Sequence, residues 1–287
     1  MNRFSLILAL GVFFSFPAGA RDIPLPGQIS SRYDLYNDEI YSRIGSRQLL
    51  ADVYVPEGRG PFPAVLVVHG GGWSGGKRTE MNFIARRLAK HRYVAVNIDY
   101  RLAPKDIFPA QIHDCKEAVR WMRANSVRFK IDPNRVGAFG YSAGAHLAAL
   151  LGVTRPSDGL EGESELGSLS SGVQAVVAGA GPMDLKKDPK SRRIVQFLGA
   201  TFEQNPEIFR KASPVTYVSK GDPPMFLYHG QWDRTVALSH STDMKRALED
   251  AGVPSQFLLI HGMGHIAVFL FNRSAIEKAI RFLDINL

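Results

Sequence analysis

The sequence predicts one domain of the α/β class, built on a mostly parallel eight-stranded sheet with helices on both faces and a small cap insertion. Continuous apolar runs rich in β-branched residues, such as residues 64–68, are typical of strands buried on both faces of a parallel sheet. These runs alternate with segments of helical apolar spacing, an order that right-handed βαβ crossovers accommodate. With 287 residues, 45% of them apolar, the chain can fill one large core.

The first twenty residues predict a signal peptide. Residues 1–3 supply a positive charge, residues 4–16 form an uncharged apolar run, and Ala18 and Ala20 give a small-x-small cleavage site. This run is too short for a permanent transmembrane helix, and no later stretch is long enough for one. We therefore expect an exported protein, periplasmic or secreted, in which residues 21–287 form a single domain without an integral membrane segment.

The charge distribution, the cysteine content and the motif spacing limit the partners and cofactors that we expect. The formal net charge is +8, but the basic residues are scattered, so a nucleic-acid interface is not supported. The alternatives left open are an ordinary solvated surface and attraction to an acidic polysaccharide or anionic membrane. Cys115 is the one cysteine and lies in a helical pattern, which indicates a buried thiol and excludes an internal disulfide. No metal-ligand spacing or dinucleotide fingerprint appears, so we expect no cofactor and no metal.

The first half of the chain predicts a hairpin followed by alternating strands and helices. Residues 21–38 are proline-rich and polar, and we expect a lead-in without regular structure. Two runs on either side of Gly45 predict an antiparallel hairpin. Apolar runs then predict strands, and helical spacing predicts helices. The predicted strands are 39–44, 49–55, 64–68 and 93–98, and the predicted helices are 80–91 and 110–124.

The second half continues this alternation around a short turn at residues 132–134. Residues 155–172 are rich in Ser, Gly and Glu and predict a surface loop. The insertion 182–223 has too few apolar residues for a core of its own, so we expect a small cap over the sheet edge, with short helices near 194–198 and 207–211. The remaining predicted strands are 135–141, 173–177, 224–228 and 255–260, and the remaining helices are 143–151, 239–251 and 273–282.

Ser142 is the candidate nucleophile. It lies in Gly140-Tyr-Ser-Ala-Gly144, where a buried strand turns into an Ala/Leu helix, so its side chain is expected at the exposed end of the strand. The bare Gly-x-Ser-x-Gly pattern is weak, because a chain of this composition contains it by chance in roughly one case in five. A second match, centred on Ser74, follows three glycines rather than a strand. Context therefore favours Ser142.

A serine nucleophile needs a base, and that base needs an acceptor that orients it. His265 lies in a glycine loop just beyond the last predicted strand, where it can reach the carboxyl edge of the sheet. His261 ends that strand and is expected to point into packing. Asp233 follows the strand 224–228 by a few residues and reaches the same edge. The other histidines fall on predicted helices or at strand ends: His69, His91, His113, His146, His229 and His240.

Three backbone amides are candidates for an oxyanion hole. Gly71 and Gly72 directly follow a buried strand, so their N–H groups can face a ligand without side chains in the way, and Ala143 begins the helix after Ser142. A flexible turn is the alternative reading of these glycines. Their place after the strand that neighbours the serine turn favours the oxyanion role.

Six motifs in order carry a family resemblance over residues 40–285. The chain resembles the α/β-hydrolase esterases of the hormone-sensitive-lipase-like group, and within it the bacterial acetyl and feruloyl carbohydrate esterases. The motifs are His69-Gly-Gly-Gly-Trp73, Asp99-Tyr-Arg-Leu-Ala-Pro104, Gly140-Tyr-Ser-Ala-Gly144, Gly181-Pro-Met-Asp-Leu185, His229-Gly-Gln-Trp-Asp233 and Gly264-His265.

The resemblance implies an α/β-hydrolase fold and a role for each matched residue. The family's nucleophile corresponds to Ser142, its acid to Asp233, its base to His265 and its oxyanion donors to Gly71, Gly72 and Ala143. Trp232 departs from the family, which more often has a small or acidic residue before the acid. We expect Trp232 to bind substrate, and Trp73 either to line the pocket or to pack beneath it. For Asp99 and Arg101 we expect an ion pair that anchors their loop, with substrate contact as the alternative. Asp114 can also tie this loop down.

The expected activity is hydrolysis of short-chain or aromatic acyl esters through a serine acyl-enzyme. Carbohydrate esters are among the candidate substrates. An arylformamidase, a lipase-like esterase and a peptidase are rivals within the same chemistry. A non-catalytic binding module is the rival from another class, but such relatives lack a triad member.

Overall fold

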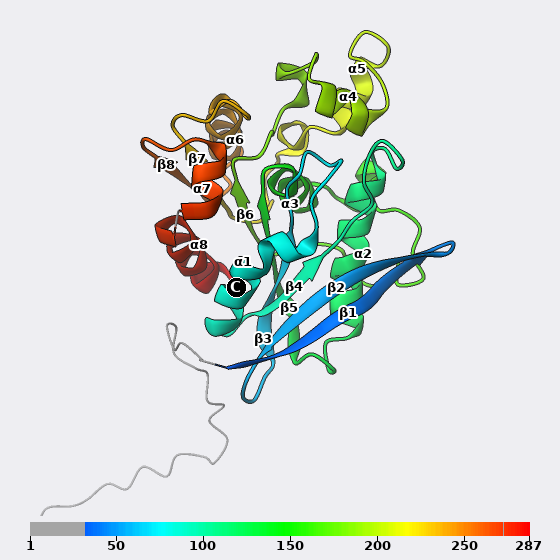
Figure 1. Cartoon of the computed structure of the whole chain (residues 1–287), viewed down its shortest axis with the longest axis vertical. Coiled ribbons are helices and arrows are strands. Elements are labelled where there is room, and N and C mark those ends of the chain that lie inside the picture. Colours follow the sequence, from blue (N-terminus) through cyan, green and yellow to red (C-terminus); the bar gives the residue numbers. More distant parts are fainter. Residues whose placement is uncertain (1–31, 272) are drawn as a thin grey trace, which may run out of the picture.

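An eight-stranded sheet runs through the centre of the computed structural model, which describes residues 32–271 and 273–287 (Figure 1). The strand order is β1-β2-β4-β3-β5-β6-β7-β8. β1 and β2 are antiparallel to their neighbours, whereas β4, β3, β5, β6, β7 and β8 are parallel. The strands are β1 (Tyr33–Ile44), β2 (Arg47–Pro56), β3 (Phe62–Val68), β4 (Val94–Ile98), β5 (Ile131–Tyr141), β6 (Ala175–Gly179), β7 (Met225–Gly230) and β8 (Ser255–Ile260).

Helices cover both faces of this sheet, as expected. The longer ones follow the amphipathic or wholly apolar segments of the sequence, and four single-turn 3₁₀ helices lie between them. The helices are α1 (Asn82–Lys90), α2 (Ala110–Ala124), α3 (Ala143–Val153), α4 (Arg192–Leu198), α5 (Pro206–Lys211), α6 (Ser239–Asp250), α7 (His265–Phe271) and α8 (Arg273–Asn286), and the 3₁₀ helices are η1 (Arg78–Met81), η2 (Pro156–Asp158), η3 (Leu185–Lys187) and η4 (Pro214–Tyr217).

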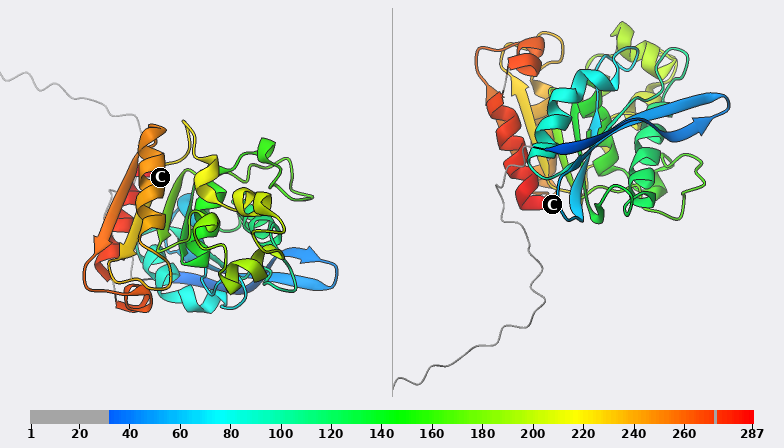
Figure 2. Two further views of the ribbon diagram at one scale, coloured as in Figure 1. Left: turned by 90° about the horizontal axis from the view of Figure 1, so that it is seen from above. Right: turned by 60° about the horizontal axis from the view of Figure 1, so that its bottom comes forward.

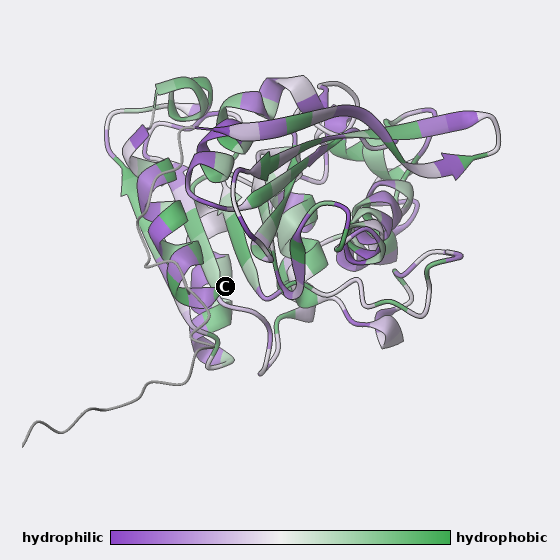
Figure 3. Cartoon of the chain, turned by 90° about the horizontal axis from the view of Figure 1, so that it is seen from below, coloured by the Kyte–Doolittle hydropathy of each residue, from purple (hydrophilic) through white to green (hydrophobic). Residues whose placement is uncertain are grey.

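The alternation of side chains along β3 shows how the core is divided into two layers. Ala64, Leu66 and Val68 pack with α2, α3 and α6 on one face, whereas Val65 and Val67 pack with α1 and α8 on the other. All five side chains are fully buried, because the strand lies at the centre of the sheet with helices on both sides. The central strands are mainly green in Figure 3, whereas the helices carry both purple and green stretches.

The hairpin is longer than the sequence predicts. Residues 33–38 were expected in an irregular lead-in, but β1 begins at Tyr33. Its pairing with β2 shifts register between Tyr36 and Glu39 and again between Ile40 and Ser42, so the period-two pattern that identifies a strand is broken. The hairpin extends beyond the helices (Figure 2). The predicted signal peptide and the start of the lead-in lie outside the described residues.

Two further elements differ from prediction. Residues 132–134 belong to β5, where a register shift against β3 between Phe62 and Ala64 accommodates them. Residues 265–271, for which the sequence predicts no element, form α7, so the predicted glycine loop ends at residue 264 and His265 begins a helix. The five other parallel strands match their predicted bounds to within two residues, because apolar runs mark buried strands clearly.

The insertion 182–223 forms the expected cap, with α4 and α5 close to the predicted positions (Figure 1). Phe197 and Phe209, one from each helix, are fully buried and belong to the same core as α3. The amide of Phe108 donates to the carbonyl of Phe197 at 2.8 Å, which joins the cap to the segment before α2. The cap is therefore an extension of the main core.

Among the residues that the structure describes, no helix combines the length and apolar character needed to cross a bilayer.

Candidate active site

Ser142 lies at a sharp turn between β5 and α3. Its backbone has φ 55° and ψ −123°, a strained conformation for a residue with a side chain. The turn is closed by tight packing: a Cβ on Gly144 would lie 2.1 Å from the carbonyl oxygen of Val68, and one on Gly140 would lie 2.1 Å from the carbonyl oxygen of Gly144. The two glycines thus let α3 begin directly against β3, which holds Ser142 at the carboxyl edge of the sheet.

The structure brings together the three residues that the sequence proposes as a triad. His265 Nε2 lies 2.9 Å from Ser142 Oγ, and His265 Nδ1 lies 2.6 Å from Asp233 Oδ2. Because a carboxylate only accepts hydrogen bonds, Nδ1 carries the proton and Nε2 is free to accept from the serine hydroxyl. These contacts span 123 and 32 residues of sequence, and they form because parallel strands deliver their carboxyl ends to one edge of the sheet.

Asp233 is a fully buried carboxylate whose side chain has four contacts. Its Oδ1 accepts the amides of Thr235 at 2.8 Å and Val236 at 2.9 Å, and its Oδ2 also faces His229 Nε2 at 3.2 Å. Burial acts to raise the pKa of Asp233, but hydrogen bonds from His229 and His265 and the Val236 amide outweigh it and hold the pKa well below its usual range. Asp233 is therefore ionised at any pH near neutral.

His229 is a member of this cluster that the sequence did not single out. Its side chain is fully buried and contacts Ser241 Oγ through Nδ1 at 2.7 Å, and its Nε2 faces both Asp233 and the carbonyl of Val236. The signal available in the sequence was its place four residues before Asp233 at the end of the same strand.

His265 begins α7, and its backbone is held as well as its ring. The hydroxyl of Tyr141 donates to the carbonyl of His265 at 2.5 Å, and the two rings lie 5.2 Å apart. Burial raises the pKa of Tyr141 far above its ordinary value, so this phenol stays protonated and keeps donating. Tyr141, which precedes Ser142 in the sequence, thus holds the backbone of His265, and the ring of His265 contacts Ser142.

The predicted oxyanion loop lies beside Ser142. A Cβ on Gly70 would be 3.3 Å from Ser142 Cβ, and Gly71 and Gly72 have positive φ values of 104° and 60°. The amides of Gly71, Gly72 and Ala143 donate no hydrogen bond to any other residue of the described ranges 32–271 and 273–287. Three N–H groups are thus available next to the serine, as a developing oxyanion requires.

Comparison with known proteins identifies the family. The BD-FAE family model matches residues 51–248, more than half of the chain. The chain belongs to the BD-FAE family. The resemblance that the six motifs indicate is thereby confirmed.

Curated relatives and solved structures agree with this family. Esterase LipC of Mycobacterium tuberculosis is 33% identical over 263 residues, covering 87% of this chain and 64% of that protein. Esterase LipQ of the same organism is 31% identical over 246 residues, covering 82% of this chain and 58% of that protein. The BD-FAE chain thus spans about three fifths of the length of these relatives.

A truncated form of a carbohydrate esterase from gut microbiota superposes with a TM-score of 0.81 at 27% identity, covering 92% of this chain and 98% of that one. The butyrate-bound esterase Est2 of Thermogutta terrifontis has a TM-score of 0.75 at 25% identity, covering 92% of this chain and 96% of that one. The α/β-hydrolase fold predicted from the sequence is confirmed by these neighbours and by the sheet order.

Trp73 packs beneath the oxyanion loop of the BD-FAE chain, the second of the two positions that the sequence left open. Its ring is 3% exposed and stacks on Phe197 of the cap with centroids 4.3 Å apart. Its Nε1–H donates to His146 Nδ1 at 3.2 Å. Trp232, in contrast, is 67% exposed on the loop that carries Asp233, so it is available to a substrate.

His146 joins three parts of the site. It accepts from Trp73 of the oxyanion loop, lies on α3 behind Ser142, and donates from Nε2 to the carbonyl of Ala212 in the cap at 2.7 Å. Burial lowers the pKa of His146 to about 4, with a further contribution from nearby His240. The neutral ring is therefore the form that holds these parts together.

Two sequence predictions near the site are wrong. Asp99 pairs with Arg78 and not with Arg101, while Arg101 pairs with Asp114 at 2.7 Å. The loop 99–104 is thus anchored at its first and third residues by partners outside it, and the tie through Asp114 is confirmed by a 2.8 Å bond from the Arg101 amide. His261 is exposed instead of packed, because β8 is an edge strand and its end has no neighbour on one side.

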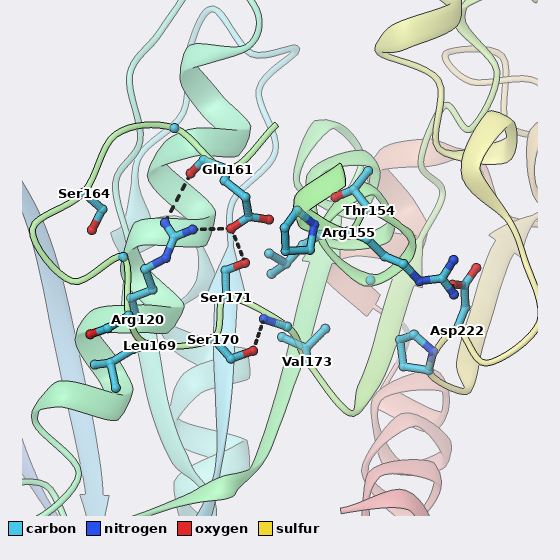
Figure 4. A pocket seen from close by; sticks show the side chains of 18 of the residues that line it. Arg120, Thr154, Arg155, Glu161, Ser164, Leu169, Ser170, Ser171, Val173 and Asp222 are labelled. Atoms are coloured by element: carbon cyan, nitrogen blue, oxygen red, sulfur yellow. Dashed lines mark hydrogen bonds and ion pairs between the residues drawn. The ribbon is translucent and has the colours of Figure 1, made fainter. Parts of the chain in front are cut away.

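A separate hollow of about 560 Å³ lies at the opposite edge of the sheet, before β6 and β7 begin (Figure 4). Its charged groups are paired with one another: Arg120 with Glu161, and Arg155 with Asp222 at 3.0 Å. Ser171 donates to Glu161 at 2.7 Å. The residues that line this hollow include no histidine, so it lacks a contact like the one between Ser142 and His265. Within the described ranges, no cluster of three or more His, Cys, Asp or Glu side chains is arranged to hold a metal ion.

Proposed function

We propose that the protein is a serine carboxylic-ester hydrolase. The observation that carries this proposal is the continuous chain of contacts from Ser142 Oγ through His265 to Asp233, at 2.9 Å and 2.6 Å, beside three free backbone amides. Nucleophile, base, orienting carboxylate and oxyanion donors are the parts that acyl transfer needs. The esterase names of the curated relatives support it.

The geometry supports a two-step reaction through an acyl-enzyme. Ser142 Oγ attacks the ester carbonyl carbon while its proton moves to His265 Nε2, and the carbonyl oxygen becomes an oxyanion held by the amides of Gly71, Gly72 and Ala143. The bond from the carbonyl carbon to the alcohol oxygen then breaks, and Nε2 returns the proton to the departing alcohol. A water molecule then attacks the acyl carbon while Nε2 takes its proton. The bond from the acyl carbon to Ser142 Oγ breaks, Nε2 returns the proton to Oγ, and the acid is released.

Asp233 stabilises the charge that His265 acquires. Because hydrogen bonds from His229, His265 and the Val236 amide keep its pKa depressed, Asp233 carries its full negative charge when the imidazolium forms. It is buried, so the attraction is little screened by water. This arrangement favours the transition state over the ground state, in which His265 is neutral.

We also propose short acyl groups, acetyl to butyryl, or an aromatic acyl group, with a sugar-like alcohol. The first part of the cap is charged (Lys186, Lys187, Asp188, Lys190, Arg192 and Arg193), so it offers little apolar surface, while each buried CH₂ of a longer chain would contribute about 0.8 kcal/mol. Exposed Trp232 is the aromatic surface available to a ring. A carbohydrate esterase and a butyrate-bound esterase among the structural neighbours favour the same classes.

The test is kcat/KM for p-nitrophenyl esters with two to sixteen acyl carbons, below the concentration at which the longer esters form micelles. We expect the maximum at two to four carbons. A maximum at ten carbons or beyond would contradict the short-acyl proposal and indicate a lipase-like esterase. N-formylkynurenine serves as a control, because faster turnover of this amide than of p-nitrophenyl acetate would identify an arylformamidase instead.

Export is a further part of the proposal, and it rests on the sequence of residues 1–20. Expression of the full chain in a bacterium should yield protein in the periplasm or the medium. N-terminal sequencing should place its first residue near Arg21. Recovery of only cytoplasmic protein that still begins at residue 1 would contradict export.

A further inference from the structure

Arg193 of the cap lies directly over the oxyanion loop. A Cβ on Gly72 would be 2.9 Å from Arg193 Cδ and 3.5 Å from its Nε, so the stem of the arginine occupies the space that a side chain at position 72 would need. Gly70, two residues earlier, lies against Ser142. At most about 7 Å of backbone therefore separates the residue under Arg193 from the residue beside the serine.

The guanidinium of Arg193 has no partner in the described part of the chain. It forms no ion pair or hydrogen bond with another described residue, and the residue is exposed. Three other basic residues of the cap do pair with carboxylates: Lys186 with Asp184, Lys187 with Asp243 and Arg210 with Glu207. Arg193 is thus a free cation at the rim of the site.

The position of Arg193 in α4 is unfavourable for the helix. Arg192 and Arg193 fill its first turn, no acidic residue is present there, and Ser191 makes no side-chain cap bond. Positive charge at the N-terminal end opposes the helix dipole, at a typical cost of about 0.3–1 kcal/mol. A local rule broken at an exposed position next to a reactive site favours a role in function over a role in folding.

We propose that Arg193 is a specificity-determining residue that binds a carboxylate on the alcohol portion of the ester substrate. This inference rests on the proposed ester hydrolysis. A planar guanidinium binds carboxylate through two parallel hydrogen bonds, which makes arginine suited to this group. We assign the carboxylate to the alcohol side because the ester carbonyl must lie at Ser142 with its oxygen on the oxyanion amides, whereas Arg193 is an exposed residue over Gly72. Acyl esters of uronic-acid saccharides or of hydroxy acids have this chemistry.

Nearby basic residues reinforce the attraction. Lys190 and Arg192 belong to the same segment and have no ion pair with a described residue, so the rim carries a positive potential that would draw an anionic ester toward Ser142. Such attraction between exposed charges weakens as salt is added, because the screening length falls from about 10 Å at 0.1 M to about 3 Å at 1 M.

The experiment compares two acetyl esters that differ in one charge on the alcohol side, 4-acetoxybenzoate and 4-acetoxybenzamide. Arg193→Gln should lower kcat/KM for the benzoate about 5- to 20-fold, mainly through KM, while kcat/KM for the benzamide stays within about twofold. Arg192→Gln is the matched control, since it removes one charge from the same turn but not the side chain over Gly72, and it should lower kcat/KM for the benzoate by less than about twofold relative to the benzamide. Raising NaCl from 0.1 M to 1 M should reduce the preference of the unmodified protein for the benzoate.

The outcomes separate this inference from the proposed function. If Arg193→Gln lowers both substrates equally, or neither, carboxylate recognition by Arg193 is wrong while ester hydrolysis stands. If the loss appears only with mono-4-nitrophenyl succinate, whose charge is on the acyl side, the assignment to the alcohol portion is overturned. If the unmodified protein hydrolyses none of these esters and a fluorophosphonate does not label Ser142, the proposed function itself fails.

Discussion

The chain contains the pattern Gly-x-Ser-x-Gly twice, at residues 72–76 and 140–144, and the two copies do different things. Ser142 has φ 55° between a buried strand and a helix, with its hydroxyl 2.9 Å from a histidine. Ser74 is exposed in the loop after β3, where its amide closes a turn on the carbonyl of Gly71. The same five-residue pattern thus marks a strand–helix turn with its serine against a histidine in one place and a turn within a loop in the other.

The glycines differ for a physical reason. Gly144 has no positive φ, but a Cβ there would lie 2.1 Å from the carbonyl oxygen of Val68, so close packing requires the glycine. Gly72 has φ 60°, so its backbone conformation favours glycine, and its bare surface also leaves room for Arg193. The comparison shows that the role of the motif depends on the elements around it. β5 leads directly into α3 at Ser142, whereas β3 leads into a loop at Ser74.

The largest expected difference between the two copies is in activity. Ser142→Ala should lower kcat by about 10⁴- to 10⁶-fold with the fold intact, because triad members act as a unit. Ser74→Ala should change kcat by less than about threefold, since its hydroxyl has no hydrogen-bonded partner within the described ranges. The measurement is p-nitrophenyl acetate hydrolysis by the two variants, with melting temperature as the control. Comparable losses in both would break the distinction.

The second difference is in packing. Gly144→Ala should reduce the free energy of unfolding by about 2–3 kcal/mol, because the new methyl group must displace the end of β3. Gly75→Ala is the comparison in the other copy, at the position that Ala143 occupies in the first, where the nearest atom is 3.7 Å from the new Cβ. We expect it to alter stability by no more than about 0.5 kcal/mol. Urea denaturation of both variants checks this, and equal stabilities would show that crowding at Gly144 relaxes freely.

The smallest expected effect concerns the hydrogen bond from Trp73 to His146. This bond joins the copy at residues 72–76 to α3, the helix that follows the copy at residues 140–144. Burial lowers the pKa of His146 to about 4, whereas an unfolded histidine has a pKa near 6.5. The unfolded chain therefore binds more protons between these values, so stability falls as pH decreases through this window and is unaffected above it. At pH 4.5 this loss amounts to about 2 kcal/mol.

His146→Gln removes the group that takes up this proton. The free energy of unfolding should therefore decline less between pH 6.5 and 4.5 in the variant than in the unmodified protein. His113, whose pKa burial also lowers to about 4, is present in both proteins, so the difference between the two curves reports on His146. Parallel curves for the variant and the unmodified protein would mean that His146 does not control the acid side of stability.

Much of the site could be predicted because its residues follow strands. Ser142, Asp233 and His265 come after three parallel strands, and the direction of those strands places them at one edge whatever the intervening loops do. The oxyanion glycines follow for the same reason, because β3 neighbours β5. The local sequence carried this information, since apolar runs identify buried strands and glycines identify the turns at their ends.

The errors concern contacts between elements that lie far apart in the sequence. Nothing near Asp99 indicates that Arg78 is its partner, because the pair forms only when η1 packs beside the end of β4. α7 was missed because the glycines before it resemble a loop, although the segment that follows contacts the core through Val268. The role of His229 depends on where Asp233 turns after the strand, which its spacing alone does not reveal.

The stack of Trp73 on Phe197 limits which substitutions and segment exchanges the cap can accommodate. Phe197 of α4 supports the ring of Trp73 in the loop after β3. If residues 182–223 were replaced by the cap of a relative, the new cap would have to supply its own partner for Trp73. Arg193 lies one turn before Phe197 in α4 and also contacts this loop, over Gly72, but it has no ion pair or hydrogen bond with a described residue. Substrate preference can therefore evolve by substitution of Arg193 while the stack of Trp73 on Phe197, one helical turn away, is kept.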